Sequence, residues 1–262
     1  MDQKVVILGS RGSIPVNGSE YLTYGGATNS IFVQLCGRSI VLDAGTGILS
    51  LPRFLRENTS EIDLLLSHGH LDHLLGLPMC PLSFRKDITI RIFGKESEAW
   101  VRRLMSPPLW PVGPEDLPAQ IRFFPMEEQF HLEEVQVSTL EGIHPGGITA
   151  IRLDGAGTRI VYITDCTLTP ELVPHLTQFA FDCDVLLCGG PYSPQQWAGK
   201  EHFGHSTWLD AARLGAVCQA KLVRIIHHSP DNTDDLLDRA AHDLTAIHPN
   251  CAFARAGEEL PL

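Results

Sequence analysis

Short apolar runs, each followed by a glycine, proline or polar turn, recur along the chain and predict many short strands. Apolar residues make up 44% of the sequence, enough for a full core. The predicted strands are Lys4–Leu8, Ile31–Leu35, Ile40–Leu42, Ile62–Leu66, Ile88–Phe93, Val135–Leu140, Ile148–Leu153, Arg159–Thr164, Asp184–Cys188 and Leu222–Ile226.

Helical spacing of apolar residues appears between several of these strands. After Thr233, which has the chemistry of a helix cap, one apolar stripe has the spacing of a helix that packs on a core. Its members are Leu236, Leu237, Ala240, Ala241, Leu244 and Ile247. The other predicted helices are Ile48–Arg56, Glu96–Met105, Pro170–Ala180 and a run that begins after Thr207.

Four potential metal ligands follow directly on the apolar run 62–66. They are His68, His70, Asp72 and His73. Imidazole and carboxylate suit zinc and similar divalent ions. Two histidines that are two residues apart in an extended loop can point the same way, and the aspartate and histidine that follow can serve a second metal. An exposed polar loop seldom holds four such groups, so we interpret the cluster as part of a metal site.

Three further candidates each lie at or near the end of a predicted strand. His144 and Asp165 are separated by one predicted hairpin, and His227 follows the strand that ends at Ile226. A sheet-based site collects its side chains at strand ends. Two metals need more ligands than the first cluster supplies, so these three residues complete the candidate set.

His-x-His-x-Asp-His after an apolar strand resembles the signature of the metallo-β-lactamase superfamily. The order of the remaining candidates is similar to that of its phosphodiesterase and ribonuclease Z-like branch. The resemblance implies one domain over residues 1–262, with an α/β fold. In that fold two mixed sheets pack face to face with helices outside, a four-layer αββα sandwich whose halves are roughly 1–140 and 141–262.

The resemblance also implies a role for each candidate. One metal is expected on His68, His70 and His144, the other on Asp72, His73 and His227, with Asp165 bridging them. His227 is preferred to His228 because His-His-Ser-Pro resembles the family's His-x-Ser-Pro.

Two more residues gain expected roles from the resemblance. Asp43 begins Asp-x-Gly-x-Gly and is expected behind the ligands, where it orients a histidine; the alternative is a cap for the helix predicted at 48–56. His205, in Gly-His-Ser-Thr, is expected to contact a phosphate and assist proton transfer; the alternative is an exposed loop histidine. Asp72 and His205 are the candidate catalytic residues.

The composition limits which substrates and which cellular compartment we expect. Twenty Lys and Arg against 31 Asp and Glu give a net charge of −11, which argues against an extended nucleic-acid footprint but not against a small anion held by metals. The seven cysteines form no Cys-x-x-Cys and predict reduced thiols in the cytoplasm. The sequence has neither the pattern of a signal peptide nor that of a membrane span.

We therefore expect a hydrolase with two divalent metal ions, zinc first, with manganese or iron as alternatives. The expected substrate is a small phosphodiester such as a cyclic nucleotide, attacked by a metal-activated hydroxide. Trp110, Tyr192 and Trp197 are candidates for stacking on a base, or are packing residues. The alternatives are RNA 3′ processing, hydrolysis of another ester, a thioester or a lactone, and a binding module that retains its metal. Redox chemistry is disfavoured because diiron relatives tend to have Glu in place of His70.

One segment remains open between structural and functional interpretations. Residues 106–118 hold five prolines with Leu109, Trp110 and Leu117. Pro107–Pro118 is expected to be a lid over the site, a partner surface or a plain connection. The resemblance implies a homodimer, for which a partner surface would serve.

Overall fold

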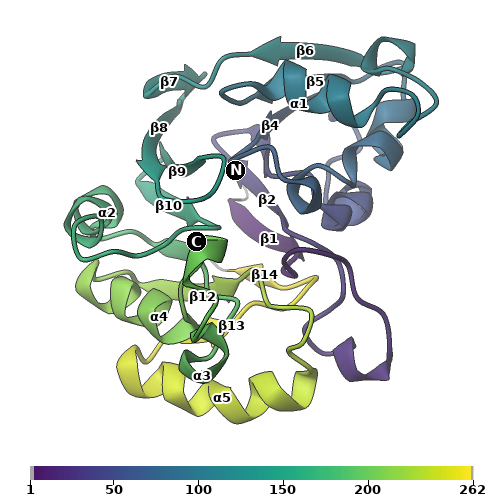
Figure 1. Ribbon diagram of the computed structural model, residues 1–262. Coiled ribbons are helices and arrows are strands. Elements are labelled where there is room, and N and C mark those ends of the chain that lie inside the picture. The colour runs from purple at the N-terminus through teal and green to yellow at the C-terminus, as the bar shows by residue number, and fades with distance from the viewer. Residues whose placement is uncertain (1–2, 261) are drawn as a thin grey trace.

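Two seven-stranded sheets face each other in the computed structural model, which describes residues 3–260 and 262 (Figure 1). The first sheet has the order β14 (Glu259–Leu260), β1 (Lys4–Gly9), β2 (Ser30–Leu35), β3 (Arg38–Leu42), β4 (Glu61–Leu65), β5 (Thr89–Phe93) and β6 (Gln120–Phe124). The second has the order β13 (Cys251–Phe253), β12 (Leu222–Ile226), β11 (Val185–Gly189), β10 (Thr158–Ile163), β9 (Ile148–Gly155), β8 (Val135–Gly142) and β7 (Gln129–Leu132).

Each sheet combines an antiparallel part with a parallel part. Pairing is antiparallel from β14 to β3 and parallel from β3 to β6. The second sheet repeats this arrangement, antiparallel from β7 to β10 and parallel from β10 to β13. Strands β1, β3 and β4 therefore end at the same edge of the first sheet, and β8, β10, β11 and β12 end at one edge of the second.

Alternation along the strands divides the apolar side chains into three layers. In β2, Ile31 and Val33 point between the sheets, whereas Phe32 points outward. In β10, Ile160 and Tyr162 point between the sheets. All five side chains are fully buried, so the space between the sheets is a closed apolar core.

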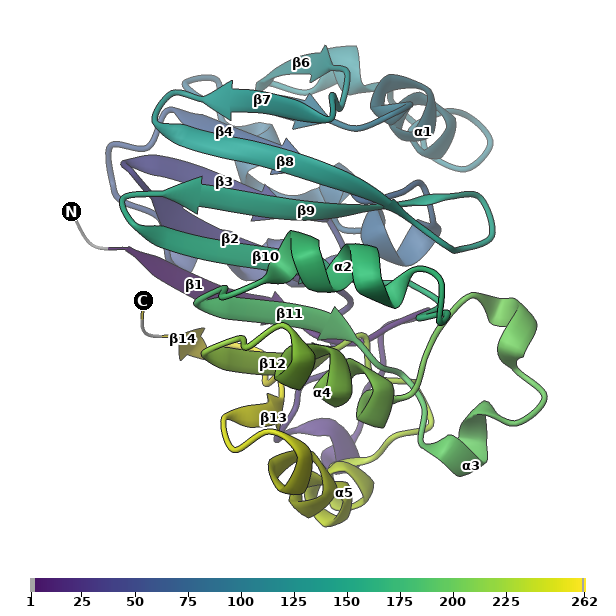
Figure 2. The same ribbon diagram turned by 90° about the vertical axis from the view of Figure 1, so that its left-hand side faces the viewer.

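Helices cover the outer face of each sheet. On the first sheet these are α1 (Ser97–Leu104) and the 3₁₀ helix η2 (Thr46–Arg53); on the second they are α2 (Val173–Ala180), α4 (Trp208–Val217) and α5 (Asp234–Ile247) (Figure 2). The short helices are η1 (Ser19–Tyr21), η3 (Leu71–His73), η4 (Leu77–Met79), η5 (Pro81–Phe84), η6 (Pro114–Asp116), α3 (Pro194–Trp197) and η7 (Glu201–Phe203). This four-layer α/β sandwich confirms the predicted fold class.

The sequence analysis missed four strands, and all four are sheet edges: β6, β7, β13 and β14. Edge strands are short and partly exposed, so their hydrophobic alternation is weak. The helix predicted at 48–56 is present at Thr46–Arg53, as a 3₁₀ helix and not as an α-helix. This helix, η2, contains Pro52. Proline lacks the N–H that an α-helix would use in a hydrogen bond, and its ring clashes with the preceding turn.

The Pro-rich segment is partly structural. Trp110 packs against the outer core of the first sheet, whereas Leu109 is 68% exposed. A role of Pro107–Pro118 as a lid or as a homodimer surface stays a prediction. Among the helices of residues 3–260 and 262, none combines the length and apolarity needed to cross a membrane.

Replacing Leu187 in β11 by alanine tests the core between the sheets. Leu187 is fully buried there, so Leu187→Ala should lower the free energy of unfolding by about 2–5 kcal/mol. Leu22→Ala is the matched control, since Leu22 is 79% exposed, and it should change that free energy by about 0.5 kcal/mol or less. Urea unfolding measures both values; equal effects would contradict this packing.

Candidate metal centre

The candidate ligands meet because the carboxyl ends of strands from both sheets face each other. His68 to His73 follow β4, His144 follows β8, Asp165 follows β10 and His227 follows β12. Their backbone positions are up to 159 residues apart, from 68 to 227, yet their side chains form two adjacent groups.

The first group consists of His68, His70, His144 and Asp165, whose ligand atoms all lie within 4.8 Å of one another. His144 Nε2 is 3.1 Å from His70 Nδ1. Oδ2 of Asp165 lies 3.7 Å from His68 Nε2 and 3.8 Å from His144 Nε2. His70 is the exposed member, so this group opens toward solvent.

The second group consists of Asp72, His73, Asp165 and His227, all buried and also within 4.8 Å. His227 Nε2 is 3.1 Å from Asp72 Oδ2 and 3.0 Å from Asp165 Oδ1. His73 Nε2 is 3.3 Å and 3.4 Å from the same two oxygens. Asp165 thus presents Oδ2 to the first group and Oδ1 to the second.

These separations fit a coordinated cation. Four ligands at about 2.0–2.1 Å from a tetrahedral zinc ion are about 3.3 Å apart. The Nδ1–H groups of His68, His73 and His144 donate to Ser67 Oγ, Asp43 and the Gly204 carbonyl, which leaves each Nε2 lone pair free. Nε2 of His68 and of His73 is buried without a hydrogen-bond partner in the described chain. The residues present therefore fit two divalent metal ions.

Asp43 supports ligands of both groups from behind. Its Oδ2 accepts hydrogen bonds from His73 Nδ1 at 2.7 Å, from Ser67 Oγ at 2.7 Å and from the Tyr162 hydroxyl at 2.6 Å. Ser67 Oγ in turn accepts from His68. The alternative role of Asp43 as a helix cap is wrong, because η2 begins after Gly45 without a side-chain cap.

Burial and charge set the protonation of the metal-free centre. Burial opposes the charged form of His227, but Asp165 and Asp72 outweigh it and raise the pKa of His227 to about 9. Despite burial, Asp165, Asp43 and Asp72 raise the pKa of His73 well above its usual value. The pKa of the Asp165 carboxyl is held well below its usual range, against burial, by His227 and His73. Without metal, His73 and His227 are therefore protonated beside the carboxylates of Asp72 and Asp165.

His205 stands beside the two groups without belonging to either. Its Nδ1 lies 4.0 Å from Asp165 Oδ2 and is buried without a hydrogen-bond partner among the described residues. Burial lowers the pKa of His205 to about 3, with Asp165 opposing. The side chain is only 8% exposed overall, so the alternative of an exposed loop histidine is wrong.

The structure separates His227 from His228. His228 is fully buried, and its Nε2–H donates to the Ala254 carbonyl at 2.9 Å. Burial lowers the pKa of His228 to about 3. It belongs to neither ligand group, whereas His227 belongs to the second.

The loop after β1 is a contributor whose role the sequence analysis did not identify. The backbone N–H of Ser13 donates to Asp72 Oδ2 at 2.7 Å. A Cβ on Gly12 would lie 2.2 Å from His227 Nδ1, so only glycine permits this close approach. Backbone N–H groups in Gly- and Ser-rich loops such as residues 9–13 can bind an anion; here the anion is the carboxylate of Asp72.

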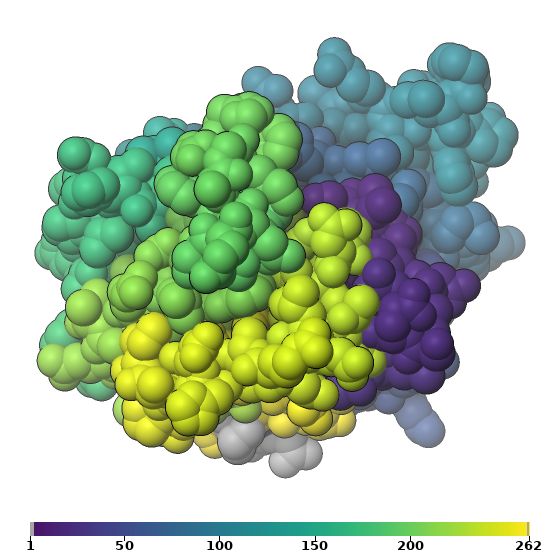
Figure 3. Space-filling model, turned by 60° about the horizontal axis from the view of Figure 1, so that its bottom comes forward, coloured from purple at the N-terminus to yellow at the C-terminus, as the bar shows by residue number. Residues whose placement is uncertain are grey.

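The loop that carries α3 and η7 (green in Figures 2 and 3) projects from the body and leads into His205. Trp197 in this loop donates from its indole to the His205 carbonyl at 3.1 Å. The ring centroid of Tyr192 lies 5.8 Å from that of His205. Trp110 packs on the outer core instead, so of the three aromatic candidates two adjoin the centre.

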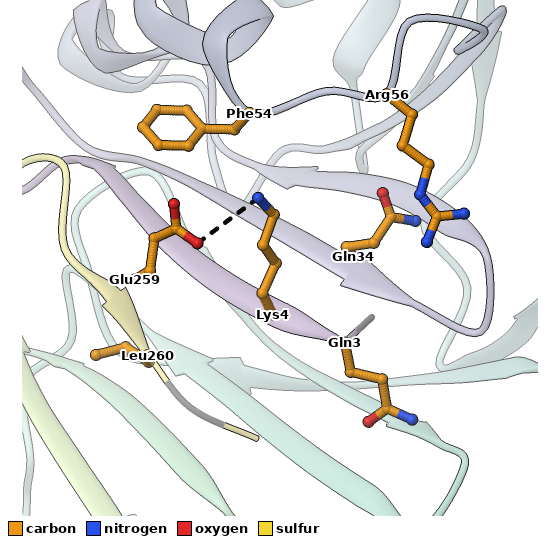
Figure 4. Close-up of a pocket in the computed structure, with 7 residues that line it drawn as sticks. All are labelled: Gln3, Lys4, Gln34, Phe54, Arg56, Glu259 and Leu260. Atoms are coloured by element: carbon orange, nitrogen blue, oxygen red, sulfur yellow. Dashed lines mark ion pairs between the residues drawn. The ribbon is translucent and has the colours of Figure 1, made fainter. Parts of the chain in front are cut away.

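A separate hollow of about 530 Å³ lies at the opposite ends of the strands (Figure 4). Lys4, at the start of β1, and Gln34, near the end of β2, contribute to its wall. Lys4 is paired there with Glu259 at 3.7 Å. This hollow is distinct from the metal-ligand groups.

Two facing mixed sheets with paired His/Asp groups at their common edge define the metallo-β-lactamase class of protein. Residues 38–228 match the family model described as "Beta-lactamase superfamily domain", and the chain belongs to that family. The resemblance predicted from the sequence is thereby confirmed. Members of this superfamily are metal-dependent hydrolases.

Three similar proteins give this membership more detail. The chain is 35% identical over 92 residues to a ribonuclease Z of Nanoarchaeum equitans, a match that covers 33% of this chain and 27% of that protein. It is 22% identical over 264 residues to the probable metallo-hydrolase YhfI of Bacillus subtilis, covering 97% and 98% of the two chains. The crystal structure of YhfI superposes with a TM-score of 0.76 at 19% identity over 100% of both chains. A diphosphatase from the PhnP family superposes with a TM-score of 0.73 at 20% identity over 100% and 98%.

Matched substitutions of the two adjacent histidines test the second ligand group. His227→Gln should bind about one metal ion fewer than the parent protein, because it removes a ligand of that group. His228→Gln keeps a donor for the Ala254 carbonyl and should bind as many ions as the parent. Metal analysis after gel filtration measures both; equal losses would contradict the assignment of His227.

The metal-free protein should lose stability as the pH rises from about 6.5 to about 9. A histidine with a raised pKa stabilises the fold below its unfolded-state pKa of about 6.5, and this stabilisation is lost as the pH rises through the folded-state value. For His227 that value is about 9. Asp72 and Asp165, whose pKa values are lowered, are ionised in both states throughout this range.

Urea unfolding in a chelator at several pH values measures this loss. Zinc should remove the pH dependence, because the cation takes the place of the protons. A metal-free protein equally stable at pH 6.5 and pH 9 would contradict the proton count assigned to the second group.

Proposed function

We propose that the protein is a phosphodiesterase that uses two divalent metal ions, zinc first, to hydrolyse a small phosphodiester such as a cyclic nucleotide. The observation that carries this proposal is the position of Asp165 between the two ligand groups. One oxygen faces each group, and His205 stands alongside. A carboxylate shared in this way suits a two-metal centre that acts on phosphorus.

The charge of the proposed centre favours a phosphate. Two divalent ions against Asp72 and Asp165 leave about +2, although the whole chain carries −11. When bound by the two groups, such ions would stabilise the entering and leaving oxygens and would lower the pKa of a bound water. A compact positive centre in an acidic chain suits a small anion better than a long polyanion.

We assign two roles to His205: it contacts the phosphate and it protonates the leaving group. The imidazole is neutral at pH 7, because burial lowers its pKa to about 3, and its N–H can donate to a phosphate oxygen. The negative charge of a bound phosphate raises this pKa, so His205 can take up a proton from solvent and then, as imidazolium, pass it to the leaving alkoxide. Such a contribution is typically about 10²–10⁴ in rate. Tyr192, beside His205, is the residue that we assign to contact the organic part of the substrate.

The second candidate function is ribonuclease Z-like cleavage of RNA. The local match of 35% identity to the archaeal ribonuclease Z favours it. The net charge of −11 opposes it, because RNA binding needs a basic footprint. The similarity to a diphosphatase of the PhnP family supports a small phosphorylated substrate instead.

The test is metal-dependent turnover of bis(p-nitrophenyl) phosphate by protein loaded with zinc or manganese. A panel of cyclic nucleotides and short RNAs with 3′ extensions then separates the two candidates. Preferred cleavage of the RNAs would favour the ribonuclease function. No turnover of any phosphodiester with two metals bound would overturn the proposal, in favour of another ester or of a binding module.

Two variants separate metal binding from proton transfer. Asp165→Ala should lose both metal ions and all activity, because the residue belongs to both ligand groups. His205→Ala should keep both ions and lose about 10²–10⁴ in kcat. Metal analysis and kinetics on the same preparations measure this. Loss of metal from His205→Ala to the level of Asp165→Ala would contradict the role given to His205.

A further inference from the structure

A chain of two hydrogen bonds runs from the first sheet to the carboxylate of Asp165. The Asn29 amide Nδ2 donates to Thr164 Oγ1 at 3.0 Å, and Thr164 Oγ1 donates to Asp165 Oδ1 at 2.7 Å. Asn29 precedes β2 of the first sheet, whereas Thr164 follows β10 of the second. Asn29 is fully buried and Thr164 is 1% exposed.

The direction of this chain is fixed by chemistry. An amide NH₂ only donates, so Thr164 Oγ1 must accept from Asn29 and is left with its single hydrogen for Asp165. The backbone of Asn29 is held on both sides. Its N–H donates to the Arg11 carbonyl at 3.0 Å, and its carbonyl accepts from Gly45 N–H at 2.9 Å. The Thr164 hydroxyl is therefore oriented before any metal binds.

The hydroxyl bonds to only one of the two carboxylate oxygens. Oδ1, which it contacts, faces His73 and His227 of the second group. Oδ2, which faces His68 and His144 of the first group, lies 3.7 Å and 3.8 Å from them. One lone pair of Oδ1 is thus occupied, and the direction of its other lone pair is set toward the second group.

We infer that Thr164, oriented by Asn29, is a positioning residue that directs Asp165 Oδ1 to the second metal and thereby sets the affinity of that metal alone. This inference rests on the two-metal site of the proposed function. Removing a hydrogen bond to a metal ligand typically lowers metal affinity about 10–100-fold. Here we expect the affinity to fall for only one of the two metals, although both share Asp165 as a ligand.

Tyr162, which lies in β10 two residues before Thr164, provides a contrast. Its hydroxyl donates to Asp43, which holds His73 directly and His68 through Ser67. Asp43 therefore supports one ligand in each group. Tyr162→Phe should weaken both metals, whereas loss of the Thr164 hydroxyl should weaken only the second.

The test compares Thr164→Val with Thr164→Ser. Valine has the shape of threonine without the hydroxyl, and serine restores the hydroxyl. Thr164→Val should bind the first metal as the parent does and the second about 10–100-fold more weakly, whereas Thr164→Ser should behave like the parent. Competition between the protein and a chelator for zinc measures the two affinities. Asn29→Ala is a second route and should weaken the same metal to a smaller extent.

Cobalt(II) absorption identifies which metal is weakened. The spectrum of Thr164→Val with limiting cobalt should match that of His227→Gln, which lacks a ligand of the second group. Equal weakening of both metals, parent-like binding by Thr164→Val or failure of Thr164→Ser to restore binding would each overturn the inference. If the parent binds two metals and hydrolyses no phosphodiester, the proposed function fails, while these affinities still decide the role of Thr164.

Discussion

Two buried carboxylates, Asp72 and Asp165, impose the constraint on which the rest of the centre depends. Neither is more than 6% exposed, and an uncompensated charge at such depth is costly. In the metal-free chain they are matched by protons on His73 and His227. Divalent cations can replace those protons and satisfy the free imidazole nitrogens at the same time. The site is thus built for cations by its own electrostatics.

The supporting hydrogen bonds connect this constraint to the packing of the sheets. Tyr162 reaches from the second sheet to Asp43 of the first, and Asn29 reaches from the first toward Asp165 of the second. Each sheet therefore positions, through a hydrogen bond, a side chain carried by the other sheet. Two residues of the centre also have left-handed backbone conformations, Asp43 with φ 59° and His227 with φ 61°. Such conformations are unfavourable for residues other than glycine and persist where the surroundings hold them.

The chemistry proposed for this centre follows from a contrast between its groups. The ligand groups are rich in charge and, except for His70, buried, while His205 is neutral and stands at their side. In this proposal the metal ions attract the phosphate, and the imidazole of His205 transfers a proton. The net charge of −11 disfavours the approach of a long polyanion more than that of a small phosphate.

The sequence by itself determined the candidate ligands, and the family resemblance that they carry implied the fold class. Dense His and Asp residues after apolar strands are visible as local patterns, as is the alternation that divides each strand into inner and outer faces. Tertiary structure decided the rest. Tyr162, Thr164 and Asn29 read as ordinary strand and turn residues, and their roles come from partners 119 and 135 residues away. The four edge strands were missed because half-exposed strands carry little periodicity. A local sequence pattern shows which side chains could bind a metal. Which atoms come into contact depends on how one sheet packs on the other.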